Sequence, residues 1–469
     1  MSTPEPAARG EARLRLRRAP SEAALLVRPV PQGGPPHGSG FTGRCGEVLD
    51  LGPRLRWLGA DGAGTPPQWE AVGARAIAGA GPARRVALDA RGLPDAVALA
   101  LATGAMLRAW RPAPKRAAVH RVELLLDAPE AFEPLWREAE ARLEALRRAR
   151  GWVAAPANRL TPSAFAAELL ELRAAGLEVE VLDGAKLRRL GAGGLLAVGQ
   201  GAADPPCLVL LRWPGRFAAA PVAFIGKGLC FDTGGISIKP AQGMEEMRGD
   251  MACAAACAGA MLSLARRNSP CPAVAVLALA ENATGAASYR PGDVLRMAAG
   301  RTVEVIDTDA EGRLVLADAL HIAASRFRPQ ALVSVATLTG SVVTALGHHR
   351  AGLFGNDAAL GTALAAAGEA VGERLWPLPI GEAHRRDLDS PIADLRQCAP
   401  AGPLLPDASH AAAFLREFVG RLPWAHLDIA GVARAEDDGQ LAARGMPTGF
   451  GVRLLDAVVA RHFEDPHRL

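Results

Sequence analysis

Runs of consecutive apolar residues recur through the last two-thirds of the chain, and they alternate with segments of helical character. Residues 222–225, 273–279 and 331–335 are such runs, and residues 251–265 and 314–325 are alanine- and leucine-rich segments of helical character. A strand that is apolar on both faces must be covered on both faces, which is typical of a parallel sheet with helical crossovers. The pattern therefore predicts an α/β fold with a mainly parallel, helix-covered sheet.

Shorter segments extend this pattern toward the N-terminus. We expect further strands at residues 23–27, 85–88, 177–181, 195–198, 207–211 and 303–306, and helices at residues 95–110 and 130–150. In the second of these helices apolar residues recur every three or four positions, as in an amphipathic helix. We therefore expect a small N-terminal α/β domain over residues 1–128, a linker helix over 129–155 and a larger domain over 156–469.

The composition excludes several classes of protein and partner. The 469 residues are 49% hydrophobic, enough for a sizeable core, and a net charge of +4 is too small to indicate a nucleic-acid or membrane-surface partner. No run approaches the ~18 apolar residues of a membrane span, and the N-terminal region lacks the apolar core of a signal peptide. Seven cysteines are dispersed without a C-x-x-C pair, which favours reduced thiols and a cytoplasmic location.

Two polar stretches follow expected strands, at the end where an α/β sheet binds ligands. The first runs from Ile225 to Pro240 and reads IGKGLCFDTGGISIKP, with Asp250 shortly after it. The second covers residues 307–314 and reads DTDAEGRL. Glycines in both stretches allow tight turns and close approach of the backbone to a bound group.

Four carboxylates in these stretches would repel one another if they met at one site without a cation. They are Asp232, Asp250, Asp309 and Glu311. Carboxylate oxygens suit Mg²⁺, Mn²⁺ or Zn²⁺, and one carboxylate can bridge two ions. Taken singly, each residue is better explained as a solvated loop carboxylate. The set as a whole favours a metal site, because basic residues are placed among the acidic ones. These basic residues are Lys227, Lys239 and Arg313.

Both stretches resemble motifs of the leucine (cytosol) aminopeptidase family. DTDAEGRL is similar to the family signature NTDAEGRL, and the segment from Gly226 resembles the family's metal-binding loop, GKGxxFDTGGISIKP. Further matches follow in register over roughly residues 150–460, at residues 157–162, 198–201, 289–293, 336–340, 424–431 and 448–451. The N-terminal third of the chain carries no matching motif.

The resemblance implies a ligand role for five residues and a catalytic domain over 156–469. Asp232 and Glu311 would bridge two metal ions, Mn²⁺ or Zn²⁺. Asp309 would complete one metal site, while Lys227 and Asp250 would complete the other.

The resemblance also implies a catalytic pair and a reaction. Lys239 is suited to stabilising the oxyanion of a tetrahedral intermediate, and Arg313 to holding a bicarbonate or similar anion that acts as general base. The expected enzyme is a leucyl aminopeptidase, a metallo-exopeptidase that hydrolyses the N-terminal residue, leucine or a similar one, from short peptides. Family members are hexamers of two stacked trimers, so we expect a homohexamer.

The chain departs from the family pattern at three places, none of which is an expected ligand. Asp307 replaces the usual Asn, residues 251–253 differ from the usual Met-Gly-Gly, and the loop 399–410 is altered.

Two other functions are less consistent with the sequence than peptide hydrolysis. An accessory DNA-binding role, known for some relatives, is disfavoured by the small net charge. A catalytically silent member is disfavoured by the intact set of seven residues. The sequence has neither a G-x-S-x-G nucleophile elbow nor a phosphate-binding G-x-x-x-x-G-K-[ST] loop.

Overall fold

The computed structural model describes residues 12–22, 24–30, 41–45, 47–112, 121–399, 407–437 and 441–464. The chain forms two compact units, each with a sheet of its own. One unit consists of residues 1–147 and 434–448, and the other of residues 148–433 and 449–469.

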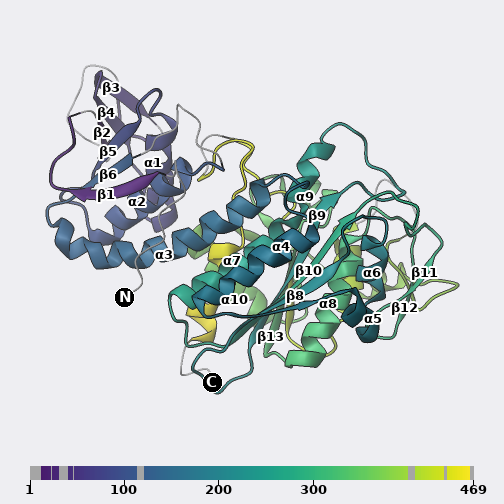
Figure 1. The fold of residues 1–469 in the computed structure, drawn as a ribbon. Helices are drawn as coiled ribbons and strands as arrows, with labels where there is room; N and C mark the ends of the chain where they lie inside the picture. Colours follow the sequence, from purple (N-terminus) through teal and green to yellow (C-terminus); the bar gives the residue numbers. More distant parts are fainter. Residues whose placement is uncertain are drawn as a thin grey trace. The chain divides into compact units, whose positions relative to one another are not determined.

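The first unit is built on a six-stranded sheet with the order β1-β6-β5-β2-β4-β3 (Figure 1). All neighbouring strands are parallel except β3 and β4. The strands are β1 (Arg13–Arg17), β2 (Leu25–Val30), β3 (Val48–Gly52), β4 (Leu55–Gly59), β5 (Arg85–Asp89) and β6 (Arg121–Leu125). Helices α1 (Pro66–Ala78) and α2 (Asp95–Ala109) pack against each other. The strand expected at 85–88 and the helix at 95–110 are confirmed, and the strand expected at 23–27 begins slightly later.

A long helix, α3 (Pro129–Ala154), covers the segment with amphipathic periodicity. Phe132, Trp136, Leu143 and Leu146 on its apolar stripe are all buried. Their spacing of three, four or seven residues places them on one side of the helix, so burying that side stabilises it. The use of residues 129–155 as a linker stays a prediction.

The second unit is built on an eight-stranded sheet with the order β15-β14-β17-β13-β9-β10-β8-β7. Its four central strands, β17, β13, β9 and β10, run parallel to one another, and β8 and β7 extend the sheet in antiparallel fashion. The strands are β7 (Glu178–Leu182), β8 (Cys207–Trp213), β9 (Val222–Asp232), β10 (Ala273–Asn282), β13 (Ala331–Ala336), β14 (Ala351–Gly355), β15 (Leu375–Pro377) and β17 (Trp424–Asp428). The expected mainly parallel sheet is therefore confirmed.

Helices cover both faces of this sheet (Figure 1). Helices α4 (Pro162–Leu170), α7 (Ala252–Arg266) and α10 (Ala358–Val371) lie on one face, and α6 (Gly193–Gly199) and α8 (Gly312–Phe327) lie on the other. The residues of α7 are alanine, cysteine and other small or apolar types, and nearly all are buried. Such small residues allow the helix to approach β9 closely: a Cβ on Gly226 would lie 2.7 Å from the Cα of Ala254. The covering helices make this sheet the core of the unit.

Shorter elements complete the second unit. They are helices α5 (Gly184–Leu190), α9 (Gly340–Leu346), α11 (Glu382–Arg386), α12 (Asp407–Arg416) and α13 (Val452–Val458), the 3₁₀ helices η1 (Glu171–Ala175) and η2 (Met244–Met251), and the π-helical turn η3 (Val459–Phe463). A small separate sheet contains β11 (Val294–Arg296), β12 (Thr302–Glu304) and β16 (Leu395–Arg396).

The strand expected at residues 195–198 is wrong, because these residues form α6. A short apolar run cannot be assigned to strand or helix by periodicity alone. The tertiary structure decides: the carboxylate of Asp318, on α8, accepts a hydrogen bond of 2.9 Å from the Leu195 N–H. That bond satisfies a donor in the first turn of α6, where no helical partner exists. The strand expected at 303–306 is shorter, as β12, and lies in the small sheet instead of the central one.

Candidate metal centre

The five expected ligands come from three segments near the carboxyl ends of the central strands. Lys227 and Asp232 belong to β9, and Asp250 lies in η2, just before α7. Asp309 lies in the loop that leads to α8, and Glu311 is the N-cap residue of that helix. Because the central strands are parallel, their carboxyl ends meet at one edge of the sheet, where loops can join their side chains into one site.

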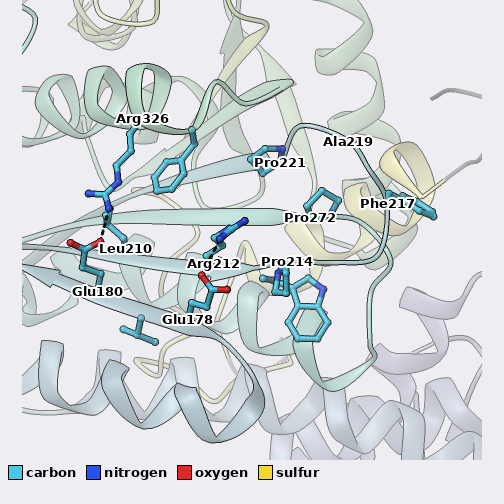
Figure 2. Close-up of a pocket in the computed structure, with 13 residues that line it drawn as sticks. Glu178, Glu180, Leu210, Arg212, Pro214, Phe217, Ala219, Pro221, Pro272 and Arg326 are labelled. Carbon is cyan, nitrogen blue, oxygen red and sulfur yellow. Dashed lines mark hydrogen bonds and ion pairs between the residues drawn. The ribbon is translucent and has the colours of Figure 1, made fainter.

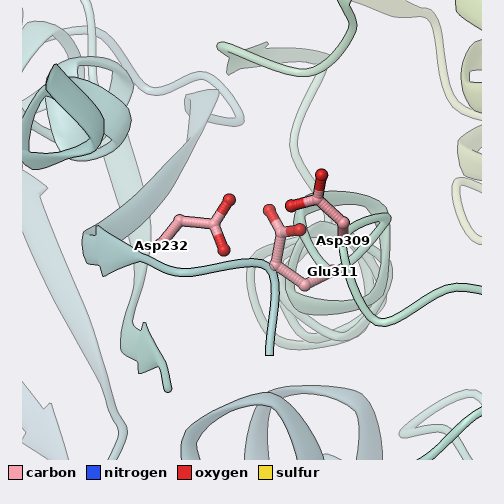
Figure 3. Close-up of side chains that lie close together, drawn as sticks. All are labelled: Asp232, Asp309 and Glu311. Atoms are coloured by element: carbon pink, nitrogen blue, oxygen red, sulfur yellow. The ribbon is translucent and has the colours of Figure 1, made fainter. Parts of the chain in front are cut away.

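Three of the carboxylates lie close together (Figure 3). Asp232, Asp309 and Glu311 each offer an oxygen that lies within 4.8 Å of the other two. Asp232 and Glu311 are buried, with 2% and 1% of their surfaces exposed, and Asp309 is partly exposed. The side chain of Asp232 points toward those of Glu311 and Asp309, which lie side by side (Figure 3), and the side chain of Asp309 is 33% exposed.

Backbone conformations restricted to glycine bring these segments together. Gly234 and Gly235, directly after β9, have φ angles of +85° and +67°, in the left-handed region that favours glycine. A Cβ on Gly234 would lie 3.0 Å from Oδ1 of Asp309, and one on Gly235 would lie 2.9 Å from Oγ1 of Thr308. The two glycines therefore let the chain after β9 turn sharply against the loop that carries Asp309.

Two lysine ammonium groups lie among the carboxylates. Lys227 Nζ is 2.8 Å from Asp250 Oδ2 and 2.8 Å from Glu311 Oε1. Lys239 Nζ is 2.9 Å from Asp232 Oδ2 and also contacts Asp309. Lys227 therefore links Asp250 to Glu311, and Lys239 links Asp232 to Asp309, so each lysine places positive charge between two carboxylates that would otherwise repel each other.

The pKa values reflect this crowding of charge. Burial and the nearby charge of Asp232 raise the pKa of Glu311 to about 8, although Lys227 acts in the opposite direction. Burial likewise raises the pKa of Asp309 to about 6, against the hydrogen bond from Lys239. Burial favours the neutral amine of Lys227, but Asp250 and Glu311 outweigh it and raise the pKa of Lys227 well above its usual value. The two lysines therefore do not fully neutralise the negative charge of the four carboxylates.

The residues present fit a divalent metal site. Oε2 of Glu311 is buried and accepts no hydrogen bond from the described residues. A buried carboxylate oxygen normally has a donor or a cation as its partner, and hard divalent cations are bound by such oxygens. Lys227 can add a nitrogen ligand only in its neutral form, because the ammonium has no lone pair.

The two expected catalytic residues lie in different surroundings. Lys239 contacts the carboxylates directly, whereas Arg313 lies in the first turn of α8 and is 3% exposed. Its Nη1 donates a 3.1 Å hydrogen bond to the carbonyl of Gln397, and its Nη2 lies 2.8 Å from Oδ1 of Asp407. Burial alone would lower the pKa of Arg313, but Asp407 raises it. Arg313 therefore stays charged beside the carboxylate set and makes no hydrogen bond to it.

Several residues that hold the site together were not singled out from the sequence. Nδ2 of Asn282, the last residue of β10, donates to Oδ1 of Asp232 at 2.8 Å and to the carbonyl of Thr308 at 3.0 Å. Thr337, after β13, accepts a 3.0 Å hydrogen bond from Lys227 through its carbonyl, and its hydroxyl contacts Asp250. A polar residue that ends a long apolar strand, as Asn282 does, is a signal that could have found the first of these. Gln397, whose carbonyl accepts the hydrogen bond from Arg313, carries no comparable signal in the local sequence.

The departures from the family pattern have different consequences. Asp307 Oδ1 accepts a 2.9 Å hydrogen bond from the Asp309 N–H, so a side-chain oxygen fixes this turn as an asparagine oxygen could. In the altered loop, residues 400–406 lie outside the described part of the chain, and residues 407–410 begin α12.

A separate groove of about 610 Å³ lies where the parallel strands β9 and β10 begin, at the opposite edge of the sheet (Figure 2). Pro221 and Pro272 line it, together with two ion pairs, Arg212–Glu178 at 3.1 Å and Arg326–Glu180 at 2.6 Å. Its charged side chains are therefore already paired with one another, and none of the expected catalytic residues lines it.

Comparison with known proteins decides what kind of site this is. A model of the cytosol aminopeptidase family, catalytic domain, matches residues 147–456. The chain belongs to this family. A probable cytosol aminopeptidase of Caulobacter vibrioides is 43% identical over 453 residues, which cover 91% of this chain and 90% of the relative. One from Gluconobacter oxydans is 47% identical over 334 residues, covering 71% of this chain and 67% of the relative.

A solved structure shows that the similarity extends to the three-dimensional fold. The bottromycin maturation enzyme BotP in complex with Mn superposes with a TM-score of 0.83 at 36% sequence identity, covering 93% of this chain and 99% of that one. The predicted family and fold class are confirmed, and the protein is a metal-dependent aminopeptidase. The roles of the individual site residues stay a prediction. Within the described part of the chain, every helix is too short or too polar to span a bilayer.

Proposed function

We propose that this cytosol aminopeptidase uses two divalent ions, Mn²⁺ or Zn²⁺, to remove leucine and similar N-terminal residues from short peptides. The observation that carries the proposal is the convergence of Asp232, Asp309 and Glu311 within 4.8 Å of one another, with Lys227 and Lys239 between them. Manganese has the additional support that the similar BotP structure is a complex with Mn.

In this proposal Asp232 and Glu311 are shared by the two ions. Asp309 would complete one site, and Lys227 with Asp250 would complete the other. The grouping of the contacts supports this division, because Lys227 lies against Asp250 and Glu311 while Asp309 lies on the other side of the set, with Lys239. The burial of Asp232, Asp250 and Glu311 supports it as well, because buried carboxylates require cationic partners.

When bound, the two ions supply Lewis acidity that polarises the scissile carbonyl and makes a water molecule more acidic. Lys239 carries a positive charge at the edge of the set and is placed to donate a hydrogen bond to the carbonyl oxygen as negative charge develops on it. Arg313 would hold a bicarbonate or similar anion, which would act as the general base. Its Nε, which has no hydrogen-bond partner among the described residues, offers a donor for that anion.

We further propose that the enzyme acts in the cytoplasm as a homohexamer. Its seven cysteines are all free, and its relatives are named as cytosol aminopeptidases. Enclosure of the active sites in such an assembly would restrict substrates to short peptides.

The experiment that tests this function is reconstitution of the metal-free protein with Mn²⁺ or Zn²⁺, followed by assay on a panel of aminoacyl substrates. Leucyl peptides with a free N-terminus should be cleaved, and the same peptides with an acetylated N-terminus should not, because an ammonium or amine at that position is part of the recognised group. Cleavage of the acetylated peptides would contradict the exopeptidase assignment. A clear preference for another class of side chain would contradict the leucyl one.

A further inference from the structure

Gln397 is a fully buried residue directly after β16, and its side-chain amide hydrogen-bonds to the loop that carries Asp309. Its Oε1 accepts hydrogen bonds from the backbone N–H groups of Ile306, at 2.7 Å, and Asp307, at 3.1 Å. Its Nε2 donates to the carbonyl of Ala310 at 3.0 Å. One side chain therefore satisfies three backbone groups in the five residues before Glu311.

The position of β16 explains why a side chain is needed there. Strands β12 and β16 pair in parallel register, with Glu304 opposite Arg396, and the Gln397 N–H donates to the Glu304 carbonyl at 3.0 Å. Val305 still pairs with Gly292 and Asp293 through its backbone, but beyond Val305 the loop leaves the sheet, so its backbone groups lose the partners that a strand would provide. Buried backbone N–H and C=O groups require partners, and the Gln397 amide supplies both an acceptor and a donor.

The backbone of the same residue contacts Arg313. The carbonyl of Gln397 accepts the 3.1 Å hydrogen bond from Arg313 Nη1. The same guanidinium also contacts Asp407, through Nη2. Gln397 therefore contacts both the loop that presents Asp309 and Glu311 and the residue proposed to hold the general base.

We propose that Gln397 is a positioning residue that sets the geometry of the metal-binding loop and of Arg313. The inference rests on the metal site and the function proposed above. Residues that orient metal ligands without touching the metal typically change metal affinity or activity 10- to 100-fold when they are replaced. A buried amide with a purely structural role would instead change the stability of the fold and leave metal affinity and turnover unaltered.

The test replaces Gln397 with methionine, which keeps the length of the side chain and removes all three of its hydrogen bonds. Gln330→Met is the matched control. Gln330 lies just before β13, at the opposite edge of the sheet, and its side chain makes a 2.6 Å hydrogen bond to the Ala220 carbonyl. For both variants, calorimetry measures Mn²⁺ and Zn²⁺ affinity of the metal-free protein, initial rates give kcat and KM at saturating metal, and thermal unfolding reports stability.

Gln397→Met should weaken metal affinity at least tenfold and lower kcat at saturating metal, with a smaller effect on KM. Gln330→Met should leave affinity and kcat unchanged. If Gln397→Met lowers only the unfolding temperature, with native affinity and native kcat, the proposal is overturned.

If Gln397→Met does not fold, Gln397→Glu decides. The carboxylate keeps both accepted hydrogen bonds but repels the Ala310 carbonyl next to Glu311, so kcat should fall at least threefold in a folded protein. Native affinity and native kcat in that variant would overturn the proposal. Failure of the metal site itself is distinguishable, because the unmodified protein would then bind no metal at these residues and Asp309→Asn would have no effect on binding.

Discussion

Lys227 Nζ lies 2.8 Å from Glu311 Oε1, so a lysine in the middle of β9 is ion-paired with the N-cap residue of α8. The approach is possible because Gly312 has no side chain: a Cβ there would lie 2.8 Å from Lys227 Nζ. Both residues are expected metal ligands, and here they contact each other, while Oε2 of Glu311 has no hydrogen-bond partner among the described residues. If Lys227 is a ligand, metal binding replaces this ion pair and removes a proton from the lysine.

The first prediction follows from that proton. Asp250 and Glu311 raise the pKa of Lys227 against the effect of burial, so the metal-free protein holds an ammonium. Only the neutral amine can bind a metal, so binding releases a proton and metal affinity should rise with pH. Calorimetry in two buffers with different ionisation enthalpies measures the number of protons released. Lys227→Arg, which keeps the cation, should bind one metal ion instead of two. Two ions bound with native affinity would show that Lys227 is not a ligand.

Asp309→Asn and Glu311→Gln should each reduce turnover to background while leaving the fold intact. Each substitution removes a metal-binding charge and keeps the side-chain volume. The exposed Asp183 provides a control, because it caps α5 and asparagine caps helices as well as aspartate does. Asp183→Asn should keep full activity. Circular dichroism and metal analysis accompany the assay. Substantial activity in either ligand variant, with unchanged metal content, would contradict the assignment.

Lys239→Met should lower kcat by about 10²- to 10³-fold, the usual effect of removing one group that stabilises an oxyanion. It should not weaken metal binding, because it removes a cation that pairs with Asp232 and Asp309. The control is Lys186→Met, which removes an exposed lysine 3.8 Å from Glu180 and should be silent. If Lys239→Met weakens metal binding and leaves kcat at saturating metal unchanged, the lysine organises the carboxylates and has no catalytic role.

His426, in the middle of the sheet, should make the fold sensitive to acid. It is 1% exposed, and burial lowers its pKa to about 3. The unfolded chain has a histidine pKa of ~6.5. The stabilisation is therefore complete above about pH 6.5 and decreases as the pH falls toward 3, because unfolding takes up a proton. Between pH 6.5 and 5 the metal-free protein should lose up to about 2 kcal/mol more than His426→Gln, measured by chemical denaturation. Identical pH dependence of the two proteins would refute a neutral buried His426.

The expected assembly is a hexamer of two stacked trimers. Light scattering at micromolar concentration, with and without Mn²⁺, measures the mass directly. A stable monomer or dimer under both conditions would contradict both the assembly and the size limit on substrates that depends on it.

The fold class and the family of the catalytic region could both be predicted from the amino-acid sequence. Apolar runs such as residues 273–279, alternating with helical segments, indicate strands of a sheet that is covered on both faces. Most of the expected ligands also lie in recognisable motifs: Asp309 and Glu311 in DTDAEGRL, which resembles the family signature, and Lys227 and Asp232 in the stretch 225–240. Chemistry that requires particular residues at short spacing leaves a local signal of this kind.

How these residues are held in place could not be predicted, because it depends on contacts that form only in the folded chain. The Gln397 amide lies against the 306–310 loop, and the Asn282 amide joins Asp232 to Thr308, through contacts between segments far apart in the chain. The position of Asn282 at the end of an apolar strand is a weak local signal, but no local pattern marks Gln397, because any buried side chain with a donor and an acceptor could make its contacts. The same holds for α6, where an apolar run became a helix because Asp318, from another helix, satisfies its first turn. Hydrogen-bond partners supplied by distant segments are properties of the folded chain, and they cannot be assigned before the segments meet.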